Sequence, residues 1–143
     1  MASVALQCAV ATSTQALTLA ERKQIKHVVL EVPLPEMPAR AAEVVVKSTQ
    51  ADRSEVAVLA VKSIMAKHKA AGALVVAAIA KAAPDAAAAA AAAAVEMDRT
   101  QAVAVVEAAG MAAPSASAEI AAAVIHASPT QSTAIKSAAF RGL

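Results

Sequence analysis

The sequence predicts an all-α protein, an α-solenoid in which antiparallel helical hairpins stack side by side. Nine consecutive alanines, from Ala86 to Ala94, form a strong helix signal. Helix-breaking residues recur at intervals of roughly 15–16 residues, which is typical of helical repeats. The chain is 59% hydrophobic yet contains one aromatic residue, Phe140, so its core must come from small aliphatic side chains.

The alanine run predicts a central helix. Alanine has the highest helix propensity and loses no side-chain entropy on folding. Pro84 can occupy a helix start, where its missing N–H has no intrahelical partner, and Asp85 places a favourable negative charge in the first turn. Because methyl side chains let backbones approach closely, we expect other helices to pack around this one on several sides.

Composition limits the possible classes of protein. A chain of 143 residues fits one domain, and a net charge of +2 selects no class of partner. A single cysteine, Cys8, excludes an intrachain disulfide and a cysteine metal cluster. Each alanine buries about one methyl group, worth about 0.8 kcal/mol. A lone domain is therefore marginal unless many close contacts or partner subunits add burial.

The N-terminal residues 1–20 carry no charged side chain and resemble an apolar leader. No Lys or Arg precedes the apolar part, however, and polar residues dilute it, so we do not expect a cleaved signal peptide. Ser3–Thr12 is expected to form a short apolar helix or strand, with Cys8 as a buried, inert thiol. We expect no transmembrane span, because Lys81 and Asp85 interrupt the later apolar region.

A capping box marks the next helix. Thr18 and Glu21 have the spacing at which each side chain bonds the other residue's backbone N–H. A helix from Leu19 to Glu31 is predicted, while a strand over residues 25–32 stays open as an alternative. Prolines 33, 35 and 38 then predict an extended connection. We therefore divide the chain into an N-terminal helical segment, 1–37, and an alanine-rich repeat array, 38–143.

The array divides into blocks of roughly 15–16 residues, each holding about three helical turns and a short turn. Three prolines mark block ends, and composition alone does not space prolines in this way. Two blocks then form an antiparallel hairpin of about 31 residues. The blocks begin at Pro38, Ser54, Ala70, Ala86, Gln101, Ser117 and Ser132.

Three blocks carry a resemblance to known proteins. The stretches 70–84 (AAGALVVAAIAKAAP), 101–114 (QAVAVVEAAGMAAP) and 117–129 (SAEIAAAVIHASP) resemble alanine-rich helical-repeat proteins of environmental bacteria. Those proteins are mostly exported and functionally uncharacterised. The resemblance implies helical hairpins and an envelope or extracellular setting, and it supplies no catalytic residues.

No pattern of residues predicts an enzyme, a cofactor or a metal site. His27, His68 and His126 lie far apart in the sequence without paired carboxylates. The glycines form no phosphate-binding loop, and Gly110 is expected to permit a close helix crossing. The basic cluster of Lys62, Lys67, His68 and Lys69 is explained by the negative end of a helix dipole. Nucleic-acid binding would require stacking aromatics, so we do not expect it.

The leading functional hypothesis is a structural subunit that assembles with copies of itself into a filament, sheath or layer. Its motivation is the apolar second half of the chain, which lacks a polar C-terminal cap. The candidate subunit-packing residues are Ala86, Ala90, Ala94, Val95, Val103, Val106, Gly110 and Val124.

The alternative is a non-enzymatic protein-binding module or adaptor whose more charged first half faces another protein. Its candidate partner surface consists of Arg40, Lys47, Arg53 and Lys62. Binding to a membrane surface is a weaker third hypothesis, because bulky apolar anchors are scarce.

Overall fold

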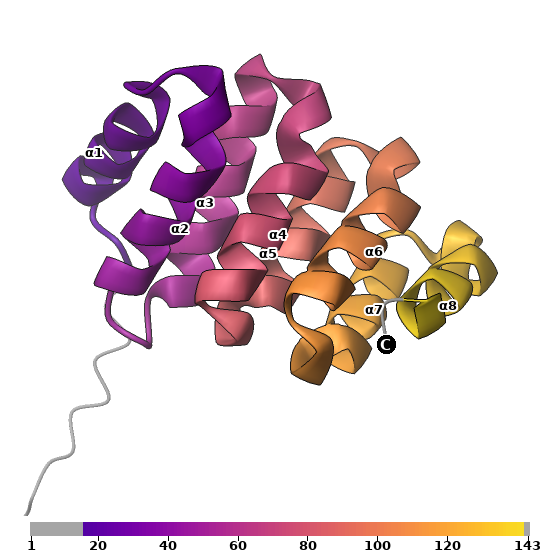
Figure 1. Cartoon of the computed structure of the whole chain (residues 1–143). Coiled ribbons are helices and arrows are strands. Elements are labelled where there is room, and N and C mark those ends of the chain that lie inside the picture. Colours follow the sequence, from indigo (N-terminus) through magenta and orange to yellow (C-terminus); the bar gives the residue numbers. More distant parts are fainter. Residues whose placement is uncertain (1–15, 142–143) are drawn as a thin grey trace, which may run out of the picture.

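The computed structural model describes residues 16–141 (Figure 1). No strand occurs in this range, which confirms the all-α class and excludes the strand alternative for residues 25–32. The helices are α1 (Leu19–Leu30), α2 (Met37–Lys47), α3 (Arg53–Lys67), α4 (Gly72–Ala82), α5 (Ala87–Met97), α6 (Ala102–Ala112), α7 (Ser117–Ala127) and α8 (Ser132–Arg141). Single 3-10 turns precede most of them: η1 (Leu34–Glu36), η2 (Lys69–Ala71), η3 (Pro84–Ala86), η4 (Arg99–Gln101), η5 (Pro114–Ala116) and η6 (Pro129–Gln131).

The helices stack in two layers. Each packs most extensively against the helix two places along the chain, so α1, α3, α5 and α7 form one layer and α2, α4, α6 and α8 form the other. Consecutive helices pack across the layers and run antiparallel. Figure 1 shows the row running from α1 at one end to α8 at the other. The predicted helical-repeat array is therefore the observed architecture.

The repeat is regular from α4 onward, where successive helices begin 15 residues apart. Each turn begins at an extended residue with φ between −133° and −153°, followed by one 3-10 turn. At the first of these, His68 N–H donates to the Ile64 carbonyl at 2.8 Å, and the His68 carbonyl accepts from Ala71 N–H at 3.0 Å. Because no described residue has a positive φ, these turns need no glycine. The extended residues are His68, Ala83, Asp98, Ala113 and Ser128.

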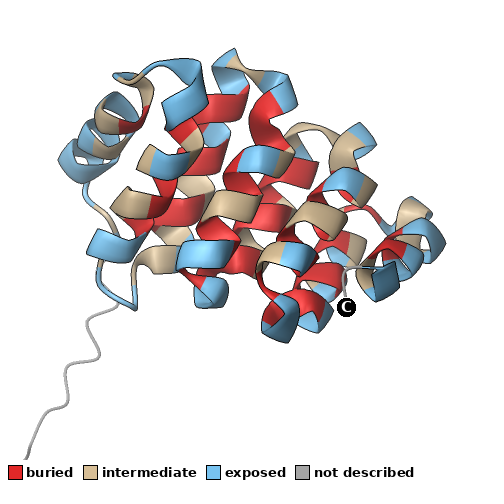
Figure 2. Ribbon diagram, in the orientation of Figure 1, coloured by how far each residue is buried: buried red, intermediate tan, exposed pale blue. Residues whose placement is uncertain are grey.

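A column of side chains with the same 15-residue spacing forms the centre of the core. All seven are fully shielded from solvent: Val45, Ala60, Val75, Ala90, Val105, Ile120 and Ile135. Figure 2 shows that the buried residues lie on the inner sides of the helices, between and within the two layers. The repeat therefore positions an equivalent aliphatic group at each step of the stack.

Helix α5 is the expected central helix. It packs against α3 and α7 in its own layer and against α4 and α6 in the other. Most of its alanine side chains are buried. The α-helix itself begins at Ala87, because Pro84 starts the preceding 3-10 turn η3 instead.

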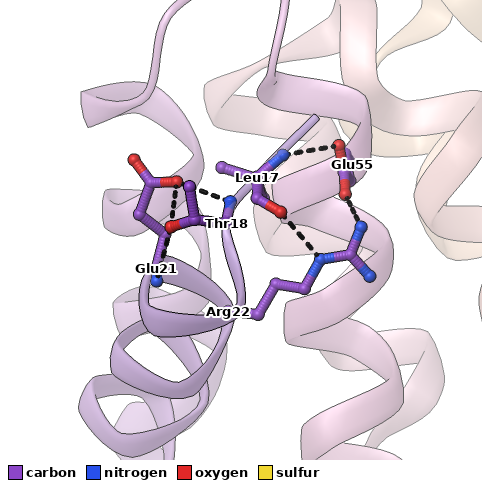
Figure 3. Close-up of polar contacts among 5 residues, drawn as sticks. All are labelled: Leu17, Thr18, Glu21, Arg22 and Glu55. Carbon is purple, nitrogen blue, oxygen red and sulfur yellow. Dashed lines mark hydrogen bonds and ion pairs between the residues drawn. The ribbon is translucent and has the colours of Figure 1, made fainter. Parts of the chain in front are cut away.

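The N-terminus of α1 carries the predicted capping box (Figure 3). Glu21 N–H donates to Thr18 Oγ1 at 3.3 Å, and Thr18 N–H donates to Glu21 Oε2 at 2.7 Å. Arg22 donates to the Leu17 carbonyl and pairs with Glu55, while Leu17 N–H donates to Glu55 at 3.4 Å. These contacts fasten the start of α1 to α3.

The proline-rich connection differs from the sequence prediction. Pro33 is extended, but Leu34–Glu36 form the 3-10 turn η1, and Pro38 lies in the first turn of α2. Proline is tolerated there because the first helical N–H groups have no intrahelical partner. Helices α1 and α2 pack onto α3 and α4, so the stack continues across the division placed between residues 37 and 38.

Candidate functional site

The residues suggested for subunit packing are largely used inside this chain. Seven are buried: Ala86, Ala90, Ala94, Val95, Val106, Gly110 and Val124. Val103 is half-buried against the same core. Neighbouring helices of the same chain therefore cover the apolar faces on which the self-assembly hypothesis was based.

The four basic residues suggested as a partner surface all form ion pairs. Arg40 and Lys47 pair with Glu43 on the same helix, at 2.9 and 2.5 Å. The other two link α3 to the next elements of its layer: Arg53 pairs with Asp85 at 3.4 Å and Lys62 with Glu96 at 3.1 Å. A partner that bound them would have to replace these carboxylates.

A different set of basic side chains surrounds a shallow hollow of about 370 Å³ between α1 and the end of α3. Lys23, Lys26 and His27 come from α1, and Lys67 comes from the last turn of α3. Within residues 16–141 none of these four forms an ion pair. Leu30 and Glu31 complete the lining. We call this feature the basic hollow.

An apolar groove of about 470 Å³ lies at the starts of α2 and α4. Leu34 and Leu74 are the large aliphatic side chains in it, and they are 46% and 67% exposed. Leu19, Val46 and Met111 are also exposed, but none of them lines this groove, whereas Leu34 and Leu74 line it together. The groove is lined by Leu34, Pro35, Pro38, His68, Lys69, Ala70, Ala71 and Leu74.

A long polar side chain bridges two neighbouring turns of one layer, η2 and η4. In turn η4, Gln101 Nε2 donates to the Lys69 carbonyl at 2.7 Å and to Asp98 Oδ2 at 3.0 Å. Gln101 thereby bridges η4 to η2. The residue at the same place in η2 is Ala71, whose methyl group cannot make this bridge to η1. Within residues 16–141 no side-chain hydrogen bond joins η1 to η2, and the groove lies between these two turns.

The hollow and the groove adjoin at a single turn. Lys67 lines the hollow, and the residues that follow it, His68 and Lys69, line the groove. On the opposite wall, Leu30 belongs to the hollow and Leu34 to the groove. We call the two together the corner surface, defined by the residues named above for each.

Part of this surface was predicted from the sequence. Lys67, His68 and Lys69 belong to the basic cluster that the helix dipole explains, whereas Lys62, the fourth member of that cluster, does not line the surface. Lys23 and Lys26, which lie more than two repeats earlier in the chain, were not predicted to line it. The signal was available, because a solenoid places helices two blocks apart next to each other.

The carboxylates with altered acidity serve structural contacts. Hydrogen bonds from Thr18 lower the pKa of Glu21, and those from Thr100 and Gln101 lower the pKa of Asp98. A hydrogen bond and the positive charge of Lys47 lower the pKa of Glu43. All three groups support a cap, a turn or a surface helix pair.

Two of the histidines considered as metal ligands, His27 and His68, line adjoining parts of the corner surface, and His126 lies apart from them. His27 lies on α1, His68 in the turn before η2 and His126 on α7. Among the described residues, no group of His, Cys, Asp or Glu is arranged to hold a metal ion. No helix in the described range has both the length and the hydrophobicity to cross a membrane. Cys8 and the Ser3–Thr12 segment lie outside the described residues.

Gly110 does not have the role expected of it. A Cβ added there would meet only the Cβ of Ser117, at 3.7 Å, which is an ordinary contact. Gly72 is the glycine in a close approach, since an added Cβ would lie 2.9 Å from both Met65 Cε and Gln101 Oε1.

Comparisons of the chain with models of protein families, with curated proteins and with solved structures found no match.

Proposed function

We propose that the chain is a non-enzymatic protein-interaction module, in which the helical stack is a scaffold and the corner surface binds a partner protein. The observation that carries this proposal is the 67% exposure of Leu74, beside lysines that form no ion pair in the described range. Exposed aliphatic groups in a concave site next to polar residues are typical of binding surfaces.

The composition of the corner surface suits recognition rather than bond making. Its lining consists of Lys, His, Leu, Pro and Ala with one carboxylate, Glu31. A nucleophile activated by a neighbouring base, or a pair of carboxylates, is the usual requirement of hydrolytic chemistry. The proposal therefore assigns binding, and no reaction, to this surface.

Site-specific crosslinking in the native host tests the proposal. A photo-reactive amino acid replaces Leu74 in the full chain, and the matched control carries it at Ala122, an exposed position on α7 in the other layer. We expect one host protein to be crosslinked reproducibly from position 74 and not from position 122. Equal crosslinking at both positions, or none at position 74, would contradict the proposal.

A second candidate function, self-assembly, is favoured by Phe140. This side chain is 79% exposed on α8, while Val95 and Gly110, at the same place in α5 and α6, are covered by the following helices. A second copy packed on α8 would cover Phe140 in the same way. Self-assembly through this face predicts that Phe140→Ser abolishes a concentration-dependent increase in particle mass. Unchanged association of the variant would contradict it.

A further inference from the structure

We infer that the corner surface recognises an acidic peptide segment that carries an adjacent aliphatic anchor residue. This inference rests on the proposed function and specifies the chemistry of the partner. The basic hollow would take the acidic residues, and the apolar groove would take the anchor.

The charge of the hollow favours an anionic partner. Lys23, Lys26 and Lys67 have no ion-pair partner in the described range, and Glu31 is the single carboxylate in the lining. The C-terminal ends of α1 and α3 also lie here, and each contributes about half a negative charge. Those partial charges together with Glu31 do not cancel three ammonium groups, so the hollow keeps a positive excess.

This arrangement differs from the rest of the structure. The cations Arg22, Arg53 and Lys62 each pair with a carboxylate on a neighbouring element of the stack. Those ion pairs join elements of one layer, whereas the lysines of the hollow form no ion pair within residues 16–141. Their positive charge is therefore available to a partner without breaking contacts that link the helices.

The groove supplies the apolar half of the recognition. A volume of about 470 Å³ lies in the range of ordinary ligand sites and accommodates aliphatic side chains. Leu34, Pro35, Pro38 and Leu74 offer aliphatic carbon on both walls, while His68 and Lys69 add polar groups at the rim. An aliphatic anchor would cover the exposed parts of Leu34 and Leu74 and gain free energy from that burial.

The adjacency of the two sites places the acidic residues and the aliphatic anchor of the partner close together in its sequence. Lys67 belongs to the hollow, and Lys69 belongs to the groove. A short extended segment can therefore reach both sites, with its acidic residues directly next to its aliphatic residue in sequence.

Single-stranded nucleic acid fits this surface less well. Bases bind to proteins largely by stacking on aromatic side chains. The one aromatic residue of the chain, Phe140, lies on α8, at the far end of the stack from α1 and the corner surface (Figure 1). The groove offers leucine and proline instead, which suits an aliphatic side chain.

Fluorescence anisotropy with the full chain tests the inference. The probe is a labelled short peptide in which a run of glutamates precedes a pair of leucines. Two comparison peptides replace the glutamates with lysines or the leucines with serines. We expect saturable binding of the first peptide, weakened by about tenfold in each comparison peptide.

Matched variants locate the binding site. Lys26→Glu combined with Lys67→Glu reverses two charges of the hollow, and Lys81→Glu combined with Lys136→Glu reverses two exposed charges elsewhere on the stack. We expect about tenfold weaker binding for the first pair and little change for the second. Leu74→Asp should weaken binding similarly. Because these side chains are exposed, helical circular dichroism should be unchanged in every variant.

Three outcomes would overturn the inference. They are no saturable binding of the acidic peptide, equally tight binding of the lysine peptide, or the same loss of peptide affinity in both pairs of charge-reversal variants. Preference for a single-stranded oligonucleotide or an anionic phospholipid vesicle over the peptide would overturn it as well. If crosslinking from position 74 still captures one host protein in any of these cases, the proposed function stands and only the partner chemistry is wrong. Failure of the crosslinking from position 74 would contradict both the proposed function and the inferred partner chemistry.

Discussion

Lys62 Nζ lies 3.1 Å from Glu96 Oε2, and the two residues are 34 positions apart in the chain. Glu107 and Arg141 have the same separation and pair at 2.6 Å in the other layer, with the charges in reversed order. Thirty-four residues equal two repeats plus about one helical turn. Stacked neighbours thus have the same register in both layers, which is the geometric signature of the solenoid.

This register predicts measurable coupling between Lys62 and Glu96. The side chains are 44% and 56% exposed, so a double-mutant cycle with alanine should give about 0.2–1 kcal/mol. The coupling should shrink as salt is added, because exposed charges are screened. The measurement is urea unfolding of the two single variants and the double variant at low and high salt. Absence of coupling at low salt would contradict the register.

The two helical glycines should respond oppositely to alanine. Gly110→Ala should raise the free energy of unfolding by roughly 0.5–1 kcal/mol, because glycine is a poor helix former and the new Cβ has room. Gly72→Ala is the matched control, since its Cβ would press on Met65 and Gln101. Urea unfolding should show a lower stability for Gly72→Ala than for Gly110→Ala. Equal stabilisation would show that Gly72 is not tightly packed.

The core column should be sensitive to volume in both directions. Ile120→Val removes one buried methylene and should cost about 0.5–1.5 kcal/mol. Ala90→Val adds volume at the same place in α5, where neighbouring helices approach closely, and should cost about 1–3 kcal/mol. Thermal and urea unfolding measure both effects. A stabilising Ala90→Val would indicate an unfilled space around α5.

Acid should destabilise the fold through three carboxylates. The pKa values of Glu21, Glu43 and Asp98 are lowered in the folded state, so the folded chain binds fewer protons than the unfolded chain. Their stabilising contribution is present above the unfolded pKa values, about 4, and is lost as the pH falls through the lowered folded values. The urea midpoint should therefore decrease below about pH 4.

Thr18→Ala provides the control for one of these groups. It removes the hydroxyl whose hydrogen bond is the largest cause of the lowered pKa of Glu21. The urea midpoint of this variant should therefore decrease less as the pH falls. An unchanged acid dependence would show that the capping box does not lower this pKa.

Much of the fold could be predicted from local chemistry. The Thr18–Glu21 capping box, the alanine run and the spacing of prolines each report short-range structure, and each prediction is confirmed. The proline-rich connection was harder, because Pro38 fits both an extended segment and a first helical turn.

The covering of apolar faces could not be predicted in the same way. Composition shows that Ala90 and Val106 need a cover, but it does not show whether that cover is the same chain or another copy. Here the stacked helices of the same chain provide it. The corner surface was missed for a related reason, since Lys23 and Lys67 meet only through the stacking of α1 on α3.

Multi-angle light scattering of the purified full chain, over a wide range of concentrations, tests whether a single chain is a complete unit that needs no contact with other copies. We expect a constant mass close to the 14.2 kDa of a single chain. A mass that rises steadily with concentration would contradict it, and would favour assembly through the exposed face around Phe140.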